Sequence, residues 1–200
     1  MKIFGSILLA MLLMCQSVWA DDISDVENII KPAVYNVVFV LKQKEMDKPD
    51  KNQKIRDIIN PLFDFQIMAK YSLGSKYWKA ISTEDQDVYS NLFIERMKES
   101  YIEKMYMYTD EEVEFEEAEV LKKRINIMTH FVSSDNNIDL LYKFYESKTE
   151  GWKVYDVEIE GVSIIQTYRS QFDSIMKKGT IKDLIEKLKV AENFSTAVKD

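Results

Sequence analysis

Side chains that commonly carry acid–base or nucleophilic chemistry are scarce in this chain. His130 is the only histidine and Cys15 the only cysteine among 200 residues. One histidine cannot supply the paired ligands of a typical zinc site, and a lone histidine is more often structural than catalytic. Ser163 lies two residues after Gly161, but the two residues after Ser163 are isoleucine, which breaks the GxSxG pattern of a nucleophile elbow. The sequence therefore predicts no catalytic residue and no metal ligand, while acid–base chemistry by carboxylates alone stays open.

The acidic balance of the chain argues against further classes of ligand. Asp and Glu number 34 against 27 Lys and Arg, which gives a formal net charge of −7 at pH 7. Nucleic-acid binding and tight docking on anionic lipid head groups both rely on clustered cations, so the sequence predicts neither. The chain also contains no P-loop and no GxGxxG loop. The acidic run at 110–119 predicts either a solvated edge strand or a docking stripe for a basic partner.

The first 20 residues have the pattern of a secretory signal peptide. Lys2 supplies a positive start, residues 3–14 are apolar, and Val18-Trp19-Ala20 ends in a small residue. The apolar stretch is too short to span a bilayer as a mature helix. The sequence therefore predicts that residues 1–20 are a cleaved signal peptide and that residues 21–200 form the mature domain.

Cleavage after Ala20 would remove Cys15 with the signal. The mature domain would then contain no disulfide and no thiol ligand. The rival interpretation is a lipoprotein signal with Cys15 as the lipidated residue. Met14 fits that interpretation poorly, because a small residue is expected before the lipidated cysteine.

The elements that must position any site follow from apolar periodicity. Spacings of three and four residues predict helices over 23–45, around 55–59, near 62–72 and over 84–107, and again over 162–178 and 180–190. Alternation predicts four strands, one from Val113 to Ala118 and the others over 125–131, 138–145 and 151–159. The predicted fold is α+β, with N-terminal helices, a four-stranded antiparallel curved sheet and C-terminal helices. A helical part would span 23–108, and a sheet-plus-helix part 110–190.

Three segments carry a resemblance to a known family. Residues 151–172, GWKVYDVEIEGVSIIQTYRSQF, have the pattern of a strand, a glycine turn and the start of a helix. The run FDFQIMA at 63–69 is followed by Leu73-Gly74 and Tyr77-Trp78. Gly179 and Leu184 follow the YRSQF run in turn. In this order the segments resemble the MlaC family, also called the toluene-tolerance or ABC-transporter auxiliary family, over about residues 23–190.

The resemblance implies a periplasmic phospholipid carrier and no enzyme. Members of that family shuttle lipid between the outer and inner membranes and so maintain the lipid asymmetry of the outer membrane. The implied partners are an inner-membrane ABC transporter with a ring-forming lipid-binding subunit and an outer-membrane lipoprotein–porin complex. The implied ligand is a phospholipid carried as cargo, without a cofactor, and its tails would be enclosed between sheet and helices.

Such a carrier needs an apolar lipid cavity, because each buried CH₂ is worth about 0.8 kcal/mol. The chain contains ten Met, ten Phe and eleven Tyr, and flexible methionines suit mixed acyl chains. Met and aromatic residues at helical spacing also build ordinary cores, so each single residue has both interpretations. The residues that we expect to face the cavity are Phe63, Met68, Leu73, Phe93, Met97, Tyr101, Met105, Ile127, Val157 and Val162.

Two other classes of function stay open on the residues alone. A cone-shaped α+β enzyme that acts on small apolar ligands would need an inward-facing acid–base pair. A periplasmic chaperone for outer-membrane polypeptides would show an open apolar groove in place of a closed pocket. Phospholipid that co-purifies with the protein at near one per chain would favour the carrier.

Overall fold

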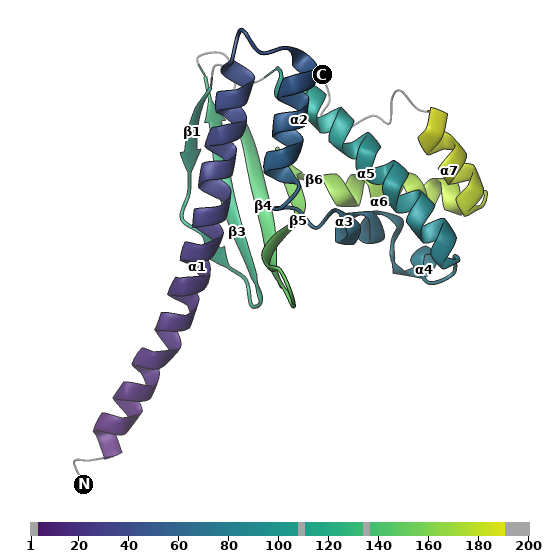
Figure 1. The fold of residues 1–200 in the computed structure, drawn as a ribbon. Helices are drawn as coiled ribbons and strands as arrows, with labels where there is room; N and C mark the ends of the chain where they lie inside the picture. The colour runs from purple at the N-terminus through teal and green to yellow at the C-terminus, as the bar shows by residue number, and fades with distance from the viewer. Residues whose placement is uncertain (1–3, 108–110, 134–136, 191–200) are drawn as a thin grey trace.

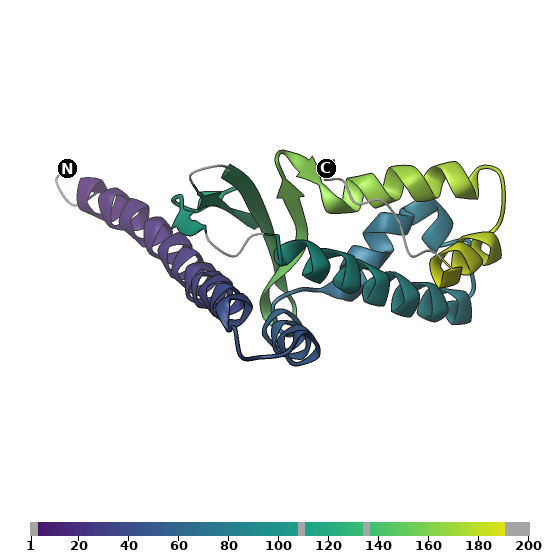
Figure 2. The same cartoon turned by 90° about the horizontal axis from the view of Figure 1, so that it is seen from above.

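The computed structural model describes residues 4–107, 111–133 and 137–190, and in it helices surround one antiparallel sheet (Figure 1). Helices α1 (Phe4–Lys42) and α2 (Lys48–Ile59) cover one face of the sheet, called the inner face below. The other helices pack together beside the sheet, as the view from above shows (Figure 2). They are α3 (Phe65–Leu73), α4 (Ser75–Trp78), α5 (Thr83–Met105), α6 (Ile164–Met176) and α7 (Ile181–Val190). The expected α+β order of helices, sheet and helices is confirmed.

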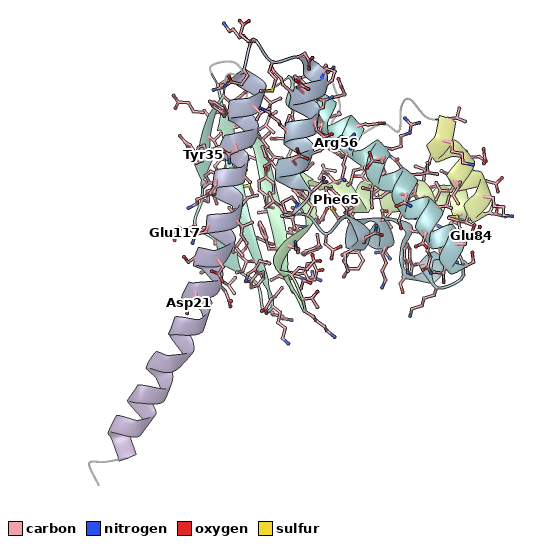
Figure 3. The ribbon with its side chains drawn as sticks, in the orientation of Figure 1. Asp21, Tyr35, Arg56, Phe65, Glu84 and Glu117 are labelled. Carbon is pink, nitrogen blue, oxygen red and sulfur yellow. The ribbon has the colours of Figure 1, made fainter. Side chains whose placement is uncertain are left out.

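Helix α1 begins well before the predicted helix and runs through Ala20 without a break. Figure 1 shows that its N-terminal part extends beyond the sheet, and Figure 3 places Asp21 near the point where the helix reaches the strands. The proposed signal peptide therefore corresponds to the projecting part, and cleavage after Ala20 stays a prediction. Within the part of the chain that the structure describes, no helix combines the length and apolarity needed to cross a membrane.

The sheet has six strands, and the prediction of four is wrong in number. Its order is β1 (Glu112–Phe115), β3 (Arg124–Val132), β4 (Asn137–Ser147), β5 (Gly151–Ile159) and β6 (Val162–Ser163), and β2 (Glu119–Val120) also pairs with β3. All pairs are antiparallel. The extra strands β2 and β6 have two residues each, which is too short for an alternating pattern. The strand predicted from Val113 to Ala118 ends at Phe115, and Gly161 turns the chain from β5 into β6.

The helices beside the sheet are held by an aromatic core. Phe93 of α5 meets Tyr168 and Phe172 of α6 edge to face, with ring centroids 5.0 and 5.9 Å apart. The predicted N-terminal cap of α5 is confirmed, since Asp85 N donates to Ser82 Oγ at 3.1 Å. Gly74 ends α3 with φ +82°, a conformation that favours glycine, and the Arg169 Nε atom lies 3.3 Å from where a Cβ would stand. These contacts fix α3, α5 and α6 as one block against the sheet.

Candidate functional site

A pocket with a cavity volume of about 180 Å³ lies between the inner face of the sheet and helices α1, α2 and α5. Four of its lining side chains carry a polar group, namely Lys98, Tyr101, Lys104 and Tyr142, and the others are apolar. Among the described residues that line it there is no histidine or carboxylate. Such a wall gives dispersion contacts and very few hydrogen bonds, so it suits an apolar ligand.

Helix α1 supplies one wall through an apolar stripe. The stripe follows the helical period of three and four residues and consists of Ile30, Ala33, Val34, Val37, Val38 and Leu41. The facing wall is the sheet, where the inward positions of three strands meet. Phe131 pairs with Ile138, and Tyr142 pairs with Val157, so that neighbouring strands present their apolar side chains side by side.

The segment between α2 and α3 fixes a third wall. Val154 N donates to Leu62 O and Asp64 N donates to Val154 O, both at 2.9 Å, so this segment pairs with β5. Asp64 then caps α3, because its side chain accepts from a backbone amide in the first turn. The pairing holds Phe63 and Phe65 stacked at the pocket with ring centroids 5.4 Å apart. The FDF run therefore fixes this segment to β5 and places the rings of Phe63 and Phe65 at the cavity.

The few polar groups of the lining are kept uncharged or at the edge. Burial raises the pKa of Tyr101 and of Tyr142 above the ordinary value of 10.0, so both hydroxyls stay neutral. Among the described residues, no group hydrogen-bonds to the Tyr101 hydroxyl. Lys98 Nζ lies 4.4 Å above the centre of the Phe65 ring and 3.8 Å from Glu95 Oε1, and burial lowers its pKa. The pocket therefore has an apolar interior, and its two lysines, Lys98 and Lys104, both come from α5.

Six of the ten predicted cavity residues line this pocket, namely Phe63, Met68, Met97, Tyr101, Met105 and Val157. The other four do not. Leu73, Phe93 and Ile127 are buried in the core outside the pocket, at 1% exposure or less. Val162 belongs to β6 and is 44% exposed, because Gly161 turns the chain outward before it. These six residues therefore line an apolar site, and lipid binding by any of them stays a prediction.

The sequence prediction missed the walls that come from α1 and α2. Val34, Val37 and Leu41 lie in the helix that apolar periodicity located, and Ile58 and Ile59 lie in the next one. The stripe on α1 was visible, but the sequence does not say which face of the sheet it covers. Leu140 and Ile159 were also missed, although they pair across β4 and β5 directly above the cavity.

His130 lies on the outer face of the sheet, away from the pocket. Its Nδ1 and Nε2 atoms are 2.7 Å from Asp139 Oδ1 and 2.9 Å from Glu116 Oε1. Hydrogen bonds to these two carboxylates raise the pKa of His130 above its ordinary value, which favours the imidazolium form. Across residues 4–107, 111–133 and 137–190, no group of three His, Cys, Asp or Glu side chains could hold a metal ion. His130 therefore joins β3, β4 and the chain after β1.

Asp156 is buried at 6% exposure within β5, three residues before the strand ends. One carboxylate oxygen accepts from Ser163 Oγ at 2.7 Å and the other from Ile165 N at 3.2 Å. Burial raises the pKa of Asp156 above its ordinary value, and these hydrogen bonds oppose the rise. Ser163 Oγ in turn accepts from Gln166 N at 3.0 Å and caps α6. Asp156 thus fixes the strand to the helix whose first residue, Ile164, lines the pocket.

The acidic run covers β1, the connection after it and the first residue of β2, and β1 is an edge strand of the sheet. Glu112, Glu114, Glu117 and Glu119 are exposed, and so is Glu116 beside His130. Figure 3 shows Glu117 at the outer side of the sheet near α1. Asp110 lies outside the described residues. The edge-strand prediction is confirmed for β1, and docking of a basic partner stays a prediction.

Known proteins resemble this chain in sequence and in fold. The model of the family described as MlaC protein matches residues 31–190. The Haemophilus influenzae intermembrane phospholipid transport system binding protein MlaC is 25% identical over 139 residues, which cover 67% of this chain and 64% of that protein. The chain thus aligns with slightly less than two thirds of this relative.

A solved structure has the same fold. The phospholipid-binding protein from Ralstonia solanacearum, determined in complex with a phospholipid, superposes with a TM-score of 0.71 at 23% sequence identity. The match covers 82% of this chain and 94% of that protein. The family model spans most of the chain, including all three segments that carry the resemblance. The chain belongs to the MlaC family.

Proposed function

We propose that this protein binds a phospholipid with its acyl tails in the pocket and its head group outside, and carries it between the inner and outer membranes. The observation that carries the proposal is the almost wholly apolar lining between α1, α2, α5 and the sheet. The relatives support it, since one is named for phospholipid transport and the other was solved with a phospholipid. Secretion to the periplasm, with removal of residues 1–20, is part of the same proposal.

The size of the cavity bears on how the lipid enters. Two acyl chains represent on the order of 25 kcal/mol of transfer free energy from water. A cavity of about 180 Å³ is smaller than the roughly 300–1,000 Å³ typical of small-molecule pockets. The described conformation is therefore a closed one, and its walls separate when the tails enter.

The seam between α1 and the sheet is the wall that separates most readily. Among the described side chains, no hydrogen bond or ion pair joins α1 to a strand. The contacts there are apolar or of the ring type. Val26, Ile30 and Val34 are buried in one core cluster with strand residues. Tyr35 lies 5.7 Å from Phe115, and Lys31 Nζ lies 5.8 Å from the same ring. Apolar and ring contacts of this kind can re-form with acyl chains in place of the sheet.

Helix α2 is joined to α5 by ion pairs. Lys48 Nζ lies 2.6 Å from Glu103 Oε2, and Arg56 lies 2.9 Å from Glu95 Oε2, so two ion pairs connect α2 to α5. Figure 3 shows Arg56 on the side of α2 that faces α5. Opening by α1 would leave this second wall in place.

Replacement of Met97 tests the site. Met97 lines the pocket and is 3% exposed, so Met97→Asp places an unpaired carboxylate among apolar groups. Native mass spectrometry of protein purified from its own envelope should show a bound diacyl phospholipid in the wild type and none in the variant. Met97→Leu is the matched control and should keep the lipid.

Two results would contradict the proposal. One is wild-type protein that arrives free of lipid and takes up none from vesicles. The other is a folded Met97→Asp variant that retains a full complement of lipid, since that would remove the pocket as the binding site.

We also propose that the exposed glutamates of β1 contact one of the two membrane complexes implied by the family. A shuttle must dock briefly on each complex, and charged contacts give fast association that weakens with salt. Glu112, Glu114 and Glu117 are exposed on or next to an edge strand, which suits a basic partner surface. The inner-membrane transporter with its ring-forming subunit and the outer-membrane lipoprotein–porin complex are the proposed partners.

A further inference from the structure

A second hollow, of about 640 Å³, lies on the outer face of the sheet. Asn126 and Lys143 line it, and their strand positions alternate with the inward positions of β3 and β4. It is therefore separate from the apolar pocket. The cations around it are Lys122, Lys123, Arg124 and Lys143. This concentration of positive charge stands out in a chain with a formal net charge of −7.

Three of these cations come from one tight hairpin between β2 and β3. Leu121 N donates to Arg124 O at 2.8 Å and Arg124 N donates to Leu121 O at 3.1 Å, so Lys122 and Lys123 form a two-residue loop. Lys122 has φ +58°, in the left-handed region that residues with a Cβ atom rarely adopt. Glycine or asparagine would occupy such a loop position with less strain. The lysine side chain is thus present in spite of the backbone conformation.

The hairpin cations have no acidic partner among the described residues. Lys143 is engaged by Glu158 and lies 3.9 Å from Asp156 Oδ2. The structure shows no ion pair for Lys122, Lys123 or Arg124 in the ranges it describes, and the Arg124 guanidinium carbon lies 4.7 Å from the centre of the Tyr155 ring. The positive charge of the loop is therefore available to an external anion.

An exposed apolar side chain adjoins this charge. Leu121 begins the hairpin loop and is 45% exposed. A leucine beside lysines and an arginine matches the surface of a bilayer, where the cations meet phosphates and the apolar side chain enters the boundary of the acyl region. A free phosphate ion would use the cations but would leave the leucine without a partner.

The hairpin lies at one end of the sheet, on the face opposite the pocket. Arg124 begins β3, whereas the pocket residue Tyr142 pairs with Ile127, three residues later. Three residues of strand span about 10 Å. Contact at the hairpin would therefore leave the walls of the pocket uncovered.

We propose that residues 121–124 bind the anionic head groups of a bilayer surface, as a contact separate from the cargo pocket. Each lysine or arginine near such a surface strengthens binding roughly fivefold, while the net negative charge of the rest of the chain opposes it. The contact is thus weak and reversible. It does not depend on lipid in the pocket, so it stands or falls separately from the proposed carrier function.

Vesicle flotation tests the proposal with the full chain. The probes are vesicles of phosphatidylcholine alone and of phosphatidylcholine mixed with phosphatidylglycerol, at low and at high salt. Lys122→Asn combined with Lys123→Gln removes two charges without adding strain and should weaken partition onto the anionic vesicles by about 25-fold. Partition onto neutral vesicles should not change.

Three comparisons make the result specific. Lys182→Gln with Lys187→Gln on α7 makes the same change in net charge at two exposed positions and should have little effect. Lys122→Arg with Lys123→Arg should retain binding. Glu119→Gln, which removes an exposed carboxylate that pairs in register with Asn126, should strengthen it. Because residues 1–20 are identical in all variants, their own affinity for vesicles cancels.

Several outcomes would overturn the inference. An equal loss of partition onto anionic vesicles in the α7 control variant would show that net charge alone causes the effect. Unchanged flotation of the hairpin variant, with its thermal unfolding like that of the wild type, would remove the hairpin as a contact. Competition by inorganic phosphate as effective as that by anionic vesicles would indicate a site for soluble phosphate in place of a membrane contact.

Discussion

Replacing Ala33 by leucine tests whether the pocket is a ligand cavity or part of a filled core. Ala33 of α1 is 8% exposed and lines the pocket. Ala33→Leu adds three carbon atoms to the cavity, and their burial contributes about 2.4 kcal/mol. Ordering the leucine side chain costs roughly 0.5–1 kcal/mol. The lipid-free protein should therefore gain about 1.5 kcal/mol in its free energy of unfolding.

The same three carbons occupy space that acyl chains need. If they displace about three methylenes of the lipid, affinity falls by the same 2.4 kcal/mol, or roughly 50-fold. Thermal unfolding of delipidated protein should rise by about 3–6 °C, at ~2–4 °C per kcal/mol for a chain of this length. Uptake from vesicles, followed by a fluorescent phospholipid, should fall in the same variant.

Ala69→Leu is the matched control. Ala69 is fully buried in α3 and does not line the pocket. Alanine and leucine have similar helix propensities, so the two substitutions differ only in their surroundings. Overpacking at Ala69 should cost about 1–3 kcal/mol. A destabilised Ala33→Leu variant that binds lipid as well as the wild type would refute the assignment of this space to the ligand.

Three further predictions concern individual side chains. Tyr101→Phe should leave the free energy of unfolding in urea unchanged or higher, because its buried hydroxyl has no hydrogen-bond partner among the described residues. Tyr89→Phe loses a 2.7 Å hydrogen bond to Ser72 and should lower that free energy by about 1 kcal/mol. Because folding raises the pKa of His130, the stability that this residue contributes should be complete below the ordinary pKa of 6.5 and lost as pH rises through the raised pKa. His130→Gln should flatten that part of the curve of stability against pH, and an unchanged curve would contradict the pairing. Changing the three exposed glutamates at 112, 114 and 117 to Lys should slow lipid delivery to the transporter at low salt with bound lipid unchanged, and equal transfer rates would move the docking surface elsewhere.

The parts of the fold that depend on long periodic segments could be predicted from the sequence. Helix α5 was located within two residues at each end, because its apolar positions and its cap at Ser82 both follow local rules. Strands β3, β4 and β5 were found by alternation. Strands β2 and β6 were not, since a two-residue strand exists only through its partner.

The site was predicted only in part for a similar reason. Met97, Tyr101 and Met105 share one face of α5, and helical spacing identifies that face. The same spacing joins Phe93 to them, but Phe93 packs between α5 and α6 because the helix passes beyond the sheet there. The α1 wall depends on where a distant helix comes to lie, which periodicity does not encode.

The hydrogen bonds of the buried Asp156 carboxylate hold β5 and α6 together, whereas α1 is the helix that we propose to move. It ties β5 to the start of α6 through Ser163 and the Ile165 amide. Neither element can rotate without breaking a buried charge-assisted hydrogen bond, so strand and helix form one rigid frame. Amide hydrogen exchange at Ile165 should therefore stay equally slow in the empty and loaded protein, while the amides of α1 after Asp21 exchange faster whenever the tails are leaving. Release of cargo would thus depend on movement of α1 away from a strand and a helix that stay fixed.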